Sequence, residues 1–484
     1  MPESNNEFKR SLNLLDATML VAGSMIGSGI FIVSADMSRS VGSAGWLLFL
    51  WLLTGVITIF GALSYGELAG MLPKAGGQFV YIQKAFGELT AFLYGWSVFT
   101  VIQSGVIAAV AMAFAKYAAV FFPAISPDNV LFTIGALKIN ASQLTAIGLL
   151  ILLTYINSRG VQNGKMIQLV FTSAKLLALF ALIILGIVIG AKSGYFSVNM
   201  QGLWDASQTI QGNDGVWHTE SLRGFALILV LGTAIVGSLF SSDSWNNVTF
   251  IAGEIKDPRK NIPRSLLLGT CIVTFCYIMA NIAYLSLLPL KGVPTGTDAV
   301  SQGIMFANNN RVGTAAASMI FGDTAVTIMA ILIMISTFGC ASGSILSGAR
   351  VYYAMAKEKL FFKQAAVLNS YNVPGFALWI QCIWMSLLCL SGSYGDLLDY
   401  CTFASLIFYS VTIAGVFALR IKDPHAERPY KVPFYPIIPM IYIILAVSIA
   451  VILLYTKTSF AGRGLLIVLL GIPFYYIQKR QQRI

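Results

Sequence analysis

Apolar stretches alternate with short polar segments along almost the whole chain. A helix of about 20 consecutive apolar residues crosses the ~30 Å hydrocarbon core of a bilayer. The breaks between the apolar stretches predict twelve such membrane-spanning helices. We place them at residues 13–36, 45–72, 87–122, 140–158, 165–191, 224–253, 265–289, 320–356, 375–392, 397–420, 434–455 and 461–478. The pattern predicts an all-α polytopic membrane protein.

Two of these stretches are interrupted near their middle. The first contains GSMIGSGIF at residues 23–31, and its glycines weaken a helix because each costs roughly 1 kcal/mol relative to alanine. The sixth contains SSDSWNN at residues 241–247, between two apolar runs that are both too short to span comfortably alone. We therefore expect the first and sixth spans to be single helices that are broken inside the membrane.

Two broken helices five spans apart are typical of transporters built from inverted repeats. Irregular backbone at membrane depth is tolerated where it lines a cavity or meets a partner. The amino end of a half-helix carries a charge of about +0.5 and suits a carboxylate, whereas freed carbonyls at a carboxyl end suit an ammonium group. Together the two breaks predict a receptor for a zwitterion, such as an amino acid.

Structural explanations of the same residues remain open. Gly23 and Gly27 form a small-xxx-small pattern, which usually marks close packing between membrane helices. Ser241, Ser242 and Asp243 are good N-cap residues for the second half of the sixth span. The aromatic side chains in spans three, nine and ten are more typical of packing than of a binding pocket.

Composition and charge support the membrane prediction and suggest an orientation. Hydrophobic residues make up 57% of the chain and charged residues 11%, against about 25% charged in soluble domains. Most of the 31 Lys and Arg residues fall on the loops of one side, which places both termini in the cytoplasm and the protein in a plasma or inner membrane. The net charge of +11 then reflects loops facing anionic lipids in the bilayer rather than nucleic acid. No removable signal peptide is expected.

Several function classes are disfavoured by what the sequence contains. No P-loop motif and no large soluble domain occur, which argues against ATP-driven pumping. His218 and His425 are the two histidines, and both fall in predicted loops. The predicted spans therefore contain no histidine that could bind a haem or a metal ion or act as a catalytic base. The six cysteines lie in or beside apolar spans without metal-ligand spacing or a disulfide framework. We expect no cofactor, no metal and no enzymatic activity.

One lysine lies deep in a predicted span. Lys175 follows Lys165 by ten residues, which is about 15 Å along a helix and too far for its side chain to reach the interface easily. Such residues usually face the protein interior and mark an ion path. Lys175 is expected to be a structural tether, a fixed substitute for a bound cation that joins span five to the broken span one, or a proton carrier. Asp16, Glu67 and Arg350 lie near span ends, where a solvated or ion-paired role is expected.

Four motifs, in order along the chain, carry a resemblance to a known family. They are GSMIGSGIF, SYGELAGMLPKAGGQFVYIQKAFG, SWNNVTFIAGEIKDPRKNIPRS and LRIKDPHAERPYKVPFYP. From about residue 10 to residue 435 the chain resembles the amino acid–polyamine–organocation (APC) superfamily, and more narrowly its L-type amino acid transporter branch, prokaryotic type. The resemblance implies the leucine-transporter fold of five-plus-five inverted repeats with two further helices, which works by alternating access.

This fold divides the chain into five parts. They are a cytoplasmic amino terminus (1–12), a first five-helix repeat (13–191), an extracellular loop (192–223), a second five-helix repeat (224–420), and helices 11 and 12 with a cytoplasmic carboxyl terminus (421–484). The polar loop at 192–223 shows no recognisable chemistry.

The resemblance also implies roles for individual residues. The backbone of Ile26, Gly27, Ser28 and Gly29 would hold the α-carboxylate of the substrate and part of its ammonium group. Three residues of the sixth span would complete the ammonium site, with the first as an aromatic gate: Phe240, Ser241 and Asp243. Lys175 matches the lysine that replaces a sodium ion in the family, and Ser405 would line the side-chain pocket.

The chain departs from the family pattern at two places. Family members often carry FAYDGW at the sixth-span break, where this chain has the more polar FSSDSW, so the size of the substrate stays open. Animal light-chain members join a heavy subunit through a cysteine in the loop after span three, and this loop has none. No disulfide-linked heavy subunit is therefore expected.

The predicted function is sodium-independent exchange of neutral L-amino acids across the lipid bilayer. One alternative is a proton-coupled amino acid symporter with Lys175 as the proton carrier. Another is an exchanger of cationic amino acids or polyamines, which the carboxylate of Asp243 would favour. A sensor that binds amino acids without transporting them is the candidate from another class.

Overall fold

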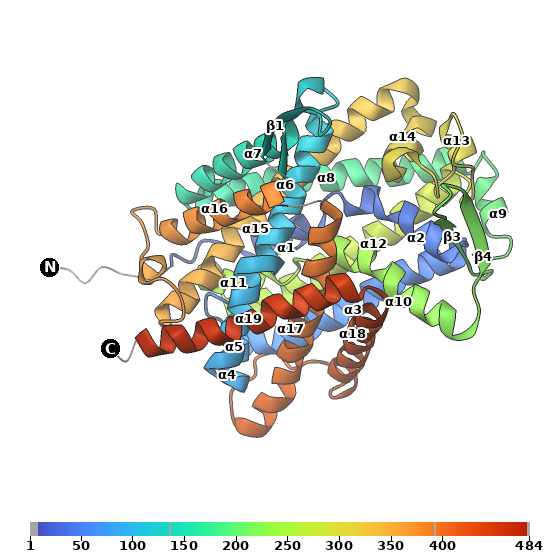
Figure 1. The fold of residues 1–484 in the computed structure, drawn as a ribbon. Helices are drawn as coiled ribbons and strands as arrows, with labels where there is room; N and C mark the ends of the chain where they lie inside the picture. Colours follow the sequence, from blue (N-terminus) through green and yellow to red (C-terminus); the bar gives the residue numbers. More distant parts are fainter. Residues whose placement is uncertain (1–7, 135–136, 392–393, 482–484) are drawn as a thin grey trace.

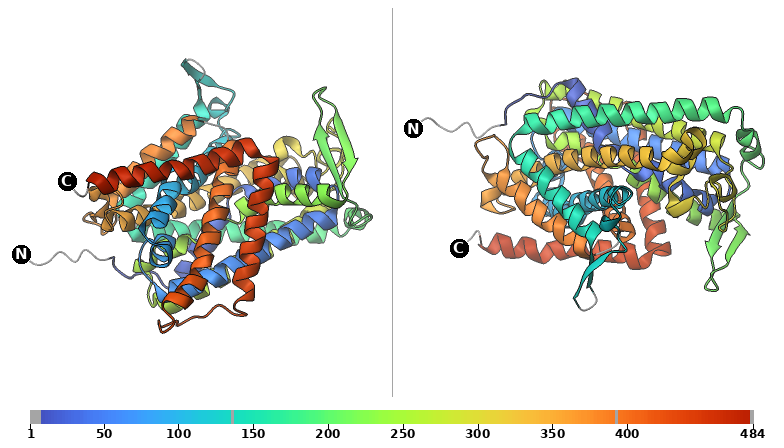
Figure 2. Two further views of the ribbon diagram at one scale, coloured as in Figure 1. Left: turned by 60° about the horizontal axis from the view of Figure 1, so that its bottom comes forward. Right: turned by 90° about the horizontal axis from the view of Figure 1, so that it is seen from above.

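The chain forms a bundle of helices that run mainly along one long axis (Figure 1). The computed structural model describes residues 8–134, 137–391 and 394–481. The first described residues and the carboxyl end of α19 (Thr458–Gln481) lie at one end of the bundle. The hairpin of β3 (Ser207–Gln211) and β4 (Trp217–Ser221) lies at the other end, as Figure 2 shows from two further directions. Both ends of the described chain therefore lie on one side. The first seven residues of the predicted cytoplasmic terminus lie outside the described residues.

Ten helices in the described part of the chain are long and apolar enough to cross a membrane. They match predicted spans two to eight and ten to twelve to within a few residues in most cases. They are α3 (Ala44–Met71), the continuous run of α5 (Glu88–Ser97), η2 (Val98–Ile102) and α6 (Gln103–Ala118), α7 (Ala141–Ser158), α8 (Val161–Gly190), α10 (Gly224–Ser241), α12 (Pro258–Leu287), the run from α14 (Val312–Phe321) through η6 (Gly322–Thr324) to α15 (Ala325–Lys357), α17 (Tyr394–Lys422), α18 (Ile437–Thr456) and α19.

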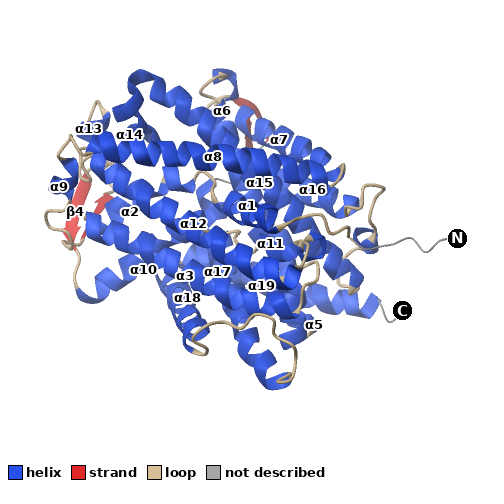
Figure 3. Ribbon diagram, turned by 180° about the vertical axis from the view of Figure 1, so that it is seen from behind, coloured by secondary structure: helices blue, strands red, loops and turns tan. Residues whose placement is uncertain are grey.

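Two shorter apolar helices fall on the remaining predicted spans. They are α1 (Leu14–Met25) and α16 (Gly375–Ser391). The predicted end of span nine at residue 392 lies outside the described residues. Both helices lie within the same bundle as the ten longer ones (Figure 3).

The outward faces of the bundle are apolar. Leu177 on α8 is 71% exposed, and Phe225 on α10 and Val451 on α18 are also exposed. Monomeric soluble proteins rarely expose such large apolar patches, whereas a bilayer solvates them. The distribution of exposed side chains therefore fits a multi-pass membrane protein.

The connections contain structure that the apolar pattern did not predict. Two antiparallel hairpins are formed by β1 (Val130–Ile134) with β2 (Leu137–Asn140), and by β3 with β4. The second hairpin and α9 (Tyr195–Asn199) occupy the polar loop 192–223. The other connecting elements are α4 (Gln78–Phe86), η3 (Pro123–Ile125), α13 (Ala299–Gln302), η5 (Asn308–Asn310) and η7 (Lys363–Ala366).

Local polar residues fix where α1 begins. The side chain of Asn13 accepts a hydrogen bond from the amide of Asp16 at 2.9 Å, and the carboxylate of Asp16 accepts one from the amide of Asn13. This reciprocal capping box satisfies amide groups that a helix start otherwise leaves free. Asp16 also pairs with Lys165 on α8 at 2.8 Å, which ties the starts of α1 and α8 together.

Buried ion pairs join other helices at the end of the bundle that holds both chain ends. Glu254 and Arg350 are essentially fully buried and meet at 2.9 Å. Glu67 on α3 receives two hydrogen bonds from the guanidinium of Arg420 on α17, at 2.8 and 2.7 Å. The expected ion-paired role of Asp16, Glu67 and Arg350 is therefore confirmed, while a solvated role is wrong for Glu67 and Arg350.

Candidate functional site

The first helix is broken at the glycines and serines of residues 23–31, as the sequence predicts. The helix α1 ends at Met25, Ile26 adopts an extended conformation, and the short helix η1 (Gly29–Phe31) leads into α2 (Val33–Val41). The first amide groups of a new helical turn have no partner within it. The break therefore presents unpaired backbone groups inside the bundle, where all the residues of 26–31 are buried.

The side chain of Lys175 reaches this break from α8. Its Nζ donates hydrogen bonds to the carbonyl oxygens of Gly23, at 2.5 Å, and Ile26, at 2.8 Å. The lysine is 3% exposed, so its charge is solvated by these carbonyl dipoles rather than by water. The structure thus brings span five to the carboxyl end of α1.

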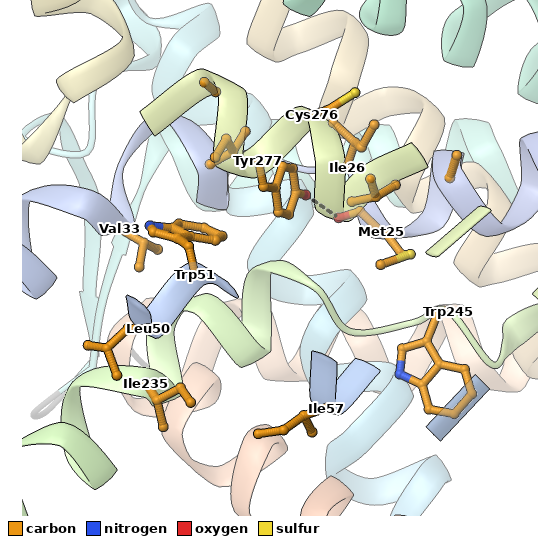
Figure 4. Close-up of a cluster of buried hydrophobic side chains, with 14 of the residues drawn as sticks. Met25, Ile26, Val33, Leu50, Trp51, Ile57, Ile235, Trp245, Cys276 and Tyr277 are labelled. Atoms are coloured by element: carbon orange, nitrogen blue, oxygen red, sulfur yellow. Dashed lines mark hydrogen bonds between the residues drawn. The ribbon is translucent and has the colours of Figure 1, made fainter. Parts of the chain in front are cut away.

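Side chains from two other helices bind further carbonyls of the first break and share the carbonyl of Ile26 with Lys175. From α15, the Ser336 hydroxyl donates to Ile26 O at 2.9 Å and the Cys340 thiol donates to Ser24 O at 3.0 Å. From α12, the Tyr277 hydroxyl is 3.2 Å from Met25 O and 2.9 Å from Ser241 O. One tyrosine therefore links the two breaks, and Figure 4 shows its ring pointing at Met25 beside Trp51.

The second break lies between α10 and the short helix α11 (Asn247–Phe250), which continues into η4 (Ala252–Glu254). Ser244 has φ 66°, in the left-handed region that ends a right-handed helix. The N-cap of α11 is Asn246, without a side-chain cap. The interpretation of Ser241, Ser242 and Asp243 as N-cap residues is therefore wrong.

The two breaks touch at Gly29 and Ser241. A Cβ atom added to Gly29 would lie 2.1 Å from Ser241 Oγ, so the contact requires glycine. Gly23 is packed in the same way, since an added Cβ would lie 1.8 Å from the amide nitrogen of Gln168. Gly27 has more room, with Cys340 Sγ at 3.8 Å as the nearest neighbour. The packing interpretation thus holds for Gly23 but not for Gly27.

A polar network surrounds the carboxylate of Asp243. The hydroxyl of Tyr409 on α17 donates to Asp243 and lies 3.2 Å from Asn246 Oδ1. The amide of Asn246 donates to Gln78 at 2.8 Å, and Gln78 in turn donates to Thr412 on α17 at 2.9 Å. The network connects the second break with α4 and α17.

Two small cavities adjoin this network, with volumes of about 10 and 30 Å³. Asp243, Ser405 and Tyr409 line both, and Phe240 lines the larger one. A cavity needs roughly 10–15 Å³ to hold one water molecule, so neither has space for an amino acid. The site is closed in this conformation.

The structure groups the predicted site residues into two neighbouring sets. Ile26 and Lys175 meet at the first break, and Gly29 meets Ser241 where the breaks touch. Phe240, Asp243 and Ser405 lie around one cavity. Gly27 and Ser28 are buried within the first break but line neither cavity.

Sequence reasoning missed several side chains that contact the breaks or Asp243, among them five that make the shorter contacts described above. They are Tyr277, Ser336, Cys340, Asn246 and Tyr409. Tyr409 packs against Tyr65 and Trp245, as the packing interpretation of the span-ten aromatic residues expects, and its hydroxyl also bonds to Asp243. Its position four residues after Ser405, on the same face of α17, was a signal that could have identified it.

Comparison with known proteins gives the same family as the motifs. The amino acid permease family matches residues 12–474 of the chain. The chain is 31% identical over 475 residues to the human large neutral amino acids transporter small subunit 2, covering 97% of this chain and 80% of that protein. It is 29% identical over 478 residues to the mouse Asc-type amino acid transporter 1, covering 97% and 81%.

A bacterial relative matches over the full length of both chains. This is the serine/threonine exchanger SteT of Bacillus subtilis, which is 30% identical over 486 residues. The family match covers nearly all of the helical bundle, including both breaks and Lys175. This chain therefore belongs to the amino acid permease family of the APC superfamily, and it is a multi-pass membrane transporter of amino acids and not an enzyme.

Proposed function

We propose that the chain is a sodium-independent exchanger of neutral L-amino acids that works by alternating access. The observation that carries the proposal is the contact of the buried Lys175 ammonium with the carbonyls of Gly23 and Ile26. In transporters with broken helices, unwound carbonyls of this kind coordinate a coupling cation. An ammonium group attached to the chain takes that place without any sodium ion.

The relatives support the substrate class. One is named for exchange of serine and threonine, and another for transport of large neutral amino acids. Serine and threonine are small, and they suit the polar run FSSDSW at the second break of this chain. We therefore propose small to medium neutral amino acids as substrates.

The charged ends of the substrate would be held at the two breaks. The amides of Gly27, Ser28 and Gly29 suit the α-carboxylate, because they begin a half-helix with partial positive charge. Ile26 would contribute backbone to the same site, although its carbonyl already binds Lys175 and Ser336.

Residues of the second break would hold the other end of the substrate. Phe240, Ser241 and Asp243 would complete the ammonium site, with the Phe240 ring as a gate, and Ser405 would line the side-chain pocket. Because the adjoining cavities hold no more than water, substrate entry requires the breaks and α17 to move apart.

We propose the leucine-transporter arrangement for the whole chain. The ten long helices, α1 and α16 would make twelve spans, with repeats at 13–191 and 224–420 and two further helices in 421–484. The loop 192–223 would be extracellular and both termini cytoplasmic. The placement of both described chain ends on one side of the bundle supports an even number of spans.

We propose that transport needs no disulfide-linked heavy subunit. The loop after span three contains no cysteine, and five of the six cysteines are buried. The sixth, Cys271, lies within α12 rather than in a loop.

Asp243 favours a second candidate function, exchange of cationic amino acids or polyamines. Its carboxylate lies at the break beside the cavities, where the Tyr409 hydroxyl, a neutral group, donates a hydrogen bond to it. A carboxylate whose charge is not neutralised attracts a cationic substrate.

Two further candidate functions are proton-coupled symport with Lys175 as the carrier and amino acid sensing without transport.

Uptake into proteoliposomes tests these functions on one preparation. Labelled serine is offered without sodium, with and without unlabelled serine inside, and with and without a proton gradient. Exchange predicts uptake that depends on unlabelled serine inside the vesicles and does not change with the proton gradient. Uptake into empty vesicles driven by inward protons would establish symport instead, and competition by lysine or putrescine would establish cationic exchange. Binding without uptake would indicate a sensor.

A further inference from the structure

A groove of about 1,090 Å³ lies between α5, α19 and the end of α15 with η7, and none of its lining residues belongs to either helix break. Its volume exceeds that of the two cavities beside Asp243 many times over. Nothing in the proposed transport cycle uses it. Drug-sized ligands occupy sites of roughly 300–1,000 Å³, so the groove has space for a ligand of considerable size.

The floor and walls of the groove are aromatic. Trp96 on α5 stacks on Phe474 of α19 with ring centroids 4.6 Å apart, and Phe99 packs edge-on against Phe361 at 5.4 Å. Phe474 is exposed beyond this stack, on the outer face of the bundle. An apolar surface that opens toward the bilayer suits a hydrocarbon chain.

The rim of the groove is positively charged. Lys357, Lys359 and Lys363 line it, and the described lining residues include no Asp or Glu. The amide of Gln478 donates to the carbonyl of Lys359 at 3.1 Å, which fixes this segment against α19. Lys357 is the last residue of the membrane-spanning helix α15, and Lys359 and Lys363 follow it, where the polar head groups of a bilayer begin.

Two carboxylates near the groove are already engaged. Glu88 on α5 pairs with Lys479 of α19. Glu358, between two of the rim lysines in sequence, accepts a hydrogen bond from Gln83 at 3.1 Å. The hydrogen bond from the neutral Gln83 leaves the negative charge of Glu358 in place, but the three rim lysines outnumber this carboxylate, so the rim keeps an excess of positive charge.

We propose that this groove binds an anionic diacyl phospholipid. Its phosphate would lie at the lysine rim formed by Lys357, Lys359 and Lys363, and an acyl chain would follow the aromatic floor between α5 and α19. Basic residues attract anionic lipids at a membrane surface, and an aromatic groove directly below them supplies the hydrocarbon contact that a free anion does not use. The proposal goes beyond the transport function and does not depend on the identity of the substrate.

Native mass spectrometry of the purified full-length chain tests this proposal. The protein is titrated with phosphatidylglycerol and with phosphatidylcholine of the same acyl chains, and the lipid retained is measured. The test variant is Lys357→Gln/Lys359→Gln/Lys363→Gln. The control variant, Lys74→Gln/Lys256→Gln/Lys260→Gln, removes the same charge from other exposed positions predicted to lie on the same side.

The wild type and the control variant should prefer phosphatidylglycerol, and the rim variant should lose at least about fivefold of that preference, since one lysine near a surface is worth about this factor. A neutral groove-filling variant, Ala366→Trp, should lose phosphatidylglycerol while its net charge is unchanged. Inorganic phosphate at millimolar concentration should not displace the lipid. Equal retention by the wild type and the rim variant would overturn the proposal, and so would equal loss from the rim and control variants or displacement by phosphate.

Discussion

Gly29 and Ser241 meet where the two broken helices touch, and a Cβ on Gly29 would lie only 2.1 Å from Ser241 Oγ. The contact joins two residues more than 200 positions apart in sequence. Such close approach requires the absence of a side chain on one partner.

The substitution Gly29→Ala should therefore destabilise the protein by about 1–3 kcal/mol, the typical cost of overpacking a buried contact. Gly27→Ala is the matched control, because the nearest neighbour of an added Cβ there is 3.8 Å away. Thermal unfolding in detergent measures both. A melting temperature for the Gly29 variant equal to that of the Gly27 variant would show that the breaks move apart without cost.

Lys175 should be essential for transport. In Lys175→Met the carbonyl of Gly23 loses the ammonium that binds it, at a cost of about 1–3 kcal/mol for a polar group left unpaired, whereas the carbonyl of Ile26 keeps its hydrogen bond from Ser336. We expect exchange to fall at least tenfold, or about 1.4 kcal/mol in barrier. The control is Lys192→Met, which makes the same change at an exposed position just beyond the same helix. Exchange by the Lys175 variant within twofold of the wild type would contradict the assigned role.

Tyr409 and Asp243 should act as a coupled pair. The variants Tyr409→Phe, Asp243→Asn and their combination form a double-mutant cycle, measured by the KM and maximal rate of exchange. Because the hydroxyl donates to the carboxylate, the effects should be non-additive by about 0.5–3 kcal/mol. Additive effects would indicate that the two side chains contribute to transport independently.

The buried pair of Glu254 and Arg350 should matter more for stability than an exposed pair. Glu254→Gln leaves the guanidinium of Arg350 without its charge partner inside the protein, which typically costs about 3–5 kcal/mol. Glu427→Gln removes the exposed partner of Arg259 and should cost less than about 1 kcal/mol. Urea or thermal unfolding monitored by intrinsic tryptophan fluorescence compares the two variants. Similar losses would show that water reaches the buried pair.

The sequence could predict the spans and the two breaks because each depends on local chemistry. Bilayer thickness sets the length of an apolar helix, and the glycines and serines at 23–29 weaken a helix wherever they stand. The depth of Lys175 could also be read from its distance to Lys165. These features need no knowledge of which helices are neighbours.

The partners of the breaks could not be predicted in the same way. In a membrane protein, the side of a helix facing lipid and the side facing the core are both apolar, so periodicity does not define the buried face. The contact of Tyr409 with Asp243 depends on the rotation of α17 against α10, which local sequence does not set. Ser336 and Cys340 on α15 look like ordinary small residues in the sequence, and their bonds to the first break can be recognised only once α1 is known to lie beside α15.

The carbonyls of the first break are held by Lys175, Ser336, Cys340 and Tyr277 through main-chain atoms alone. Every amino acid supplies the same carbonyl, so the backbone of the first break is held in a way that does not depend on the side chains at 24–26. If the charged ends of the substrate bind this backbone as we propose, selectivity for the rest of the substrate depends on other helices, including α10 and α17. In that arrangement, substitutions on α10 and α17 change which amino acid is carried, while the binding of the α-carboxylate and ammonium groups that all amino acids share is unaffected.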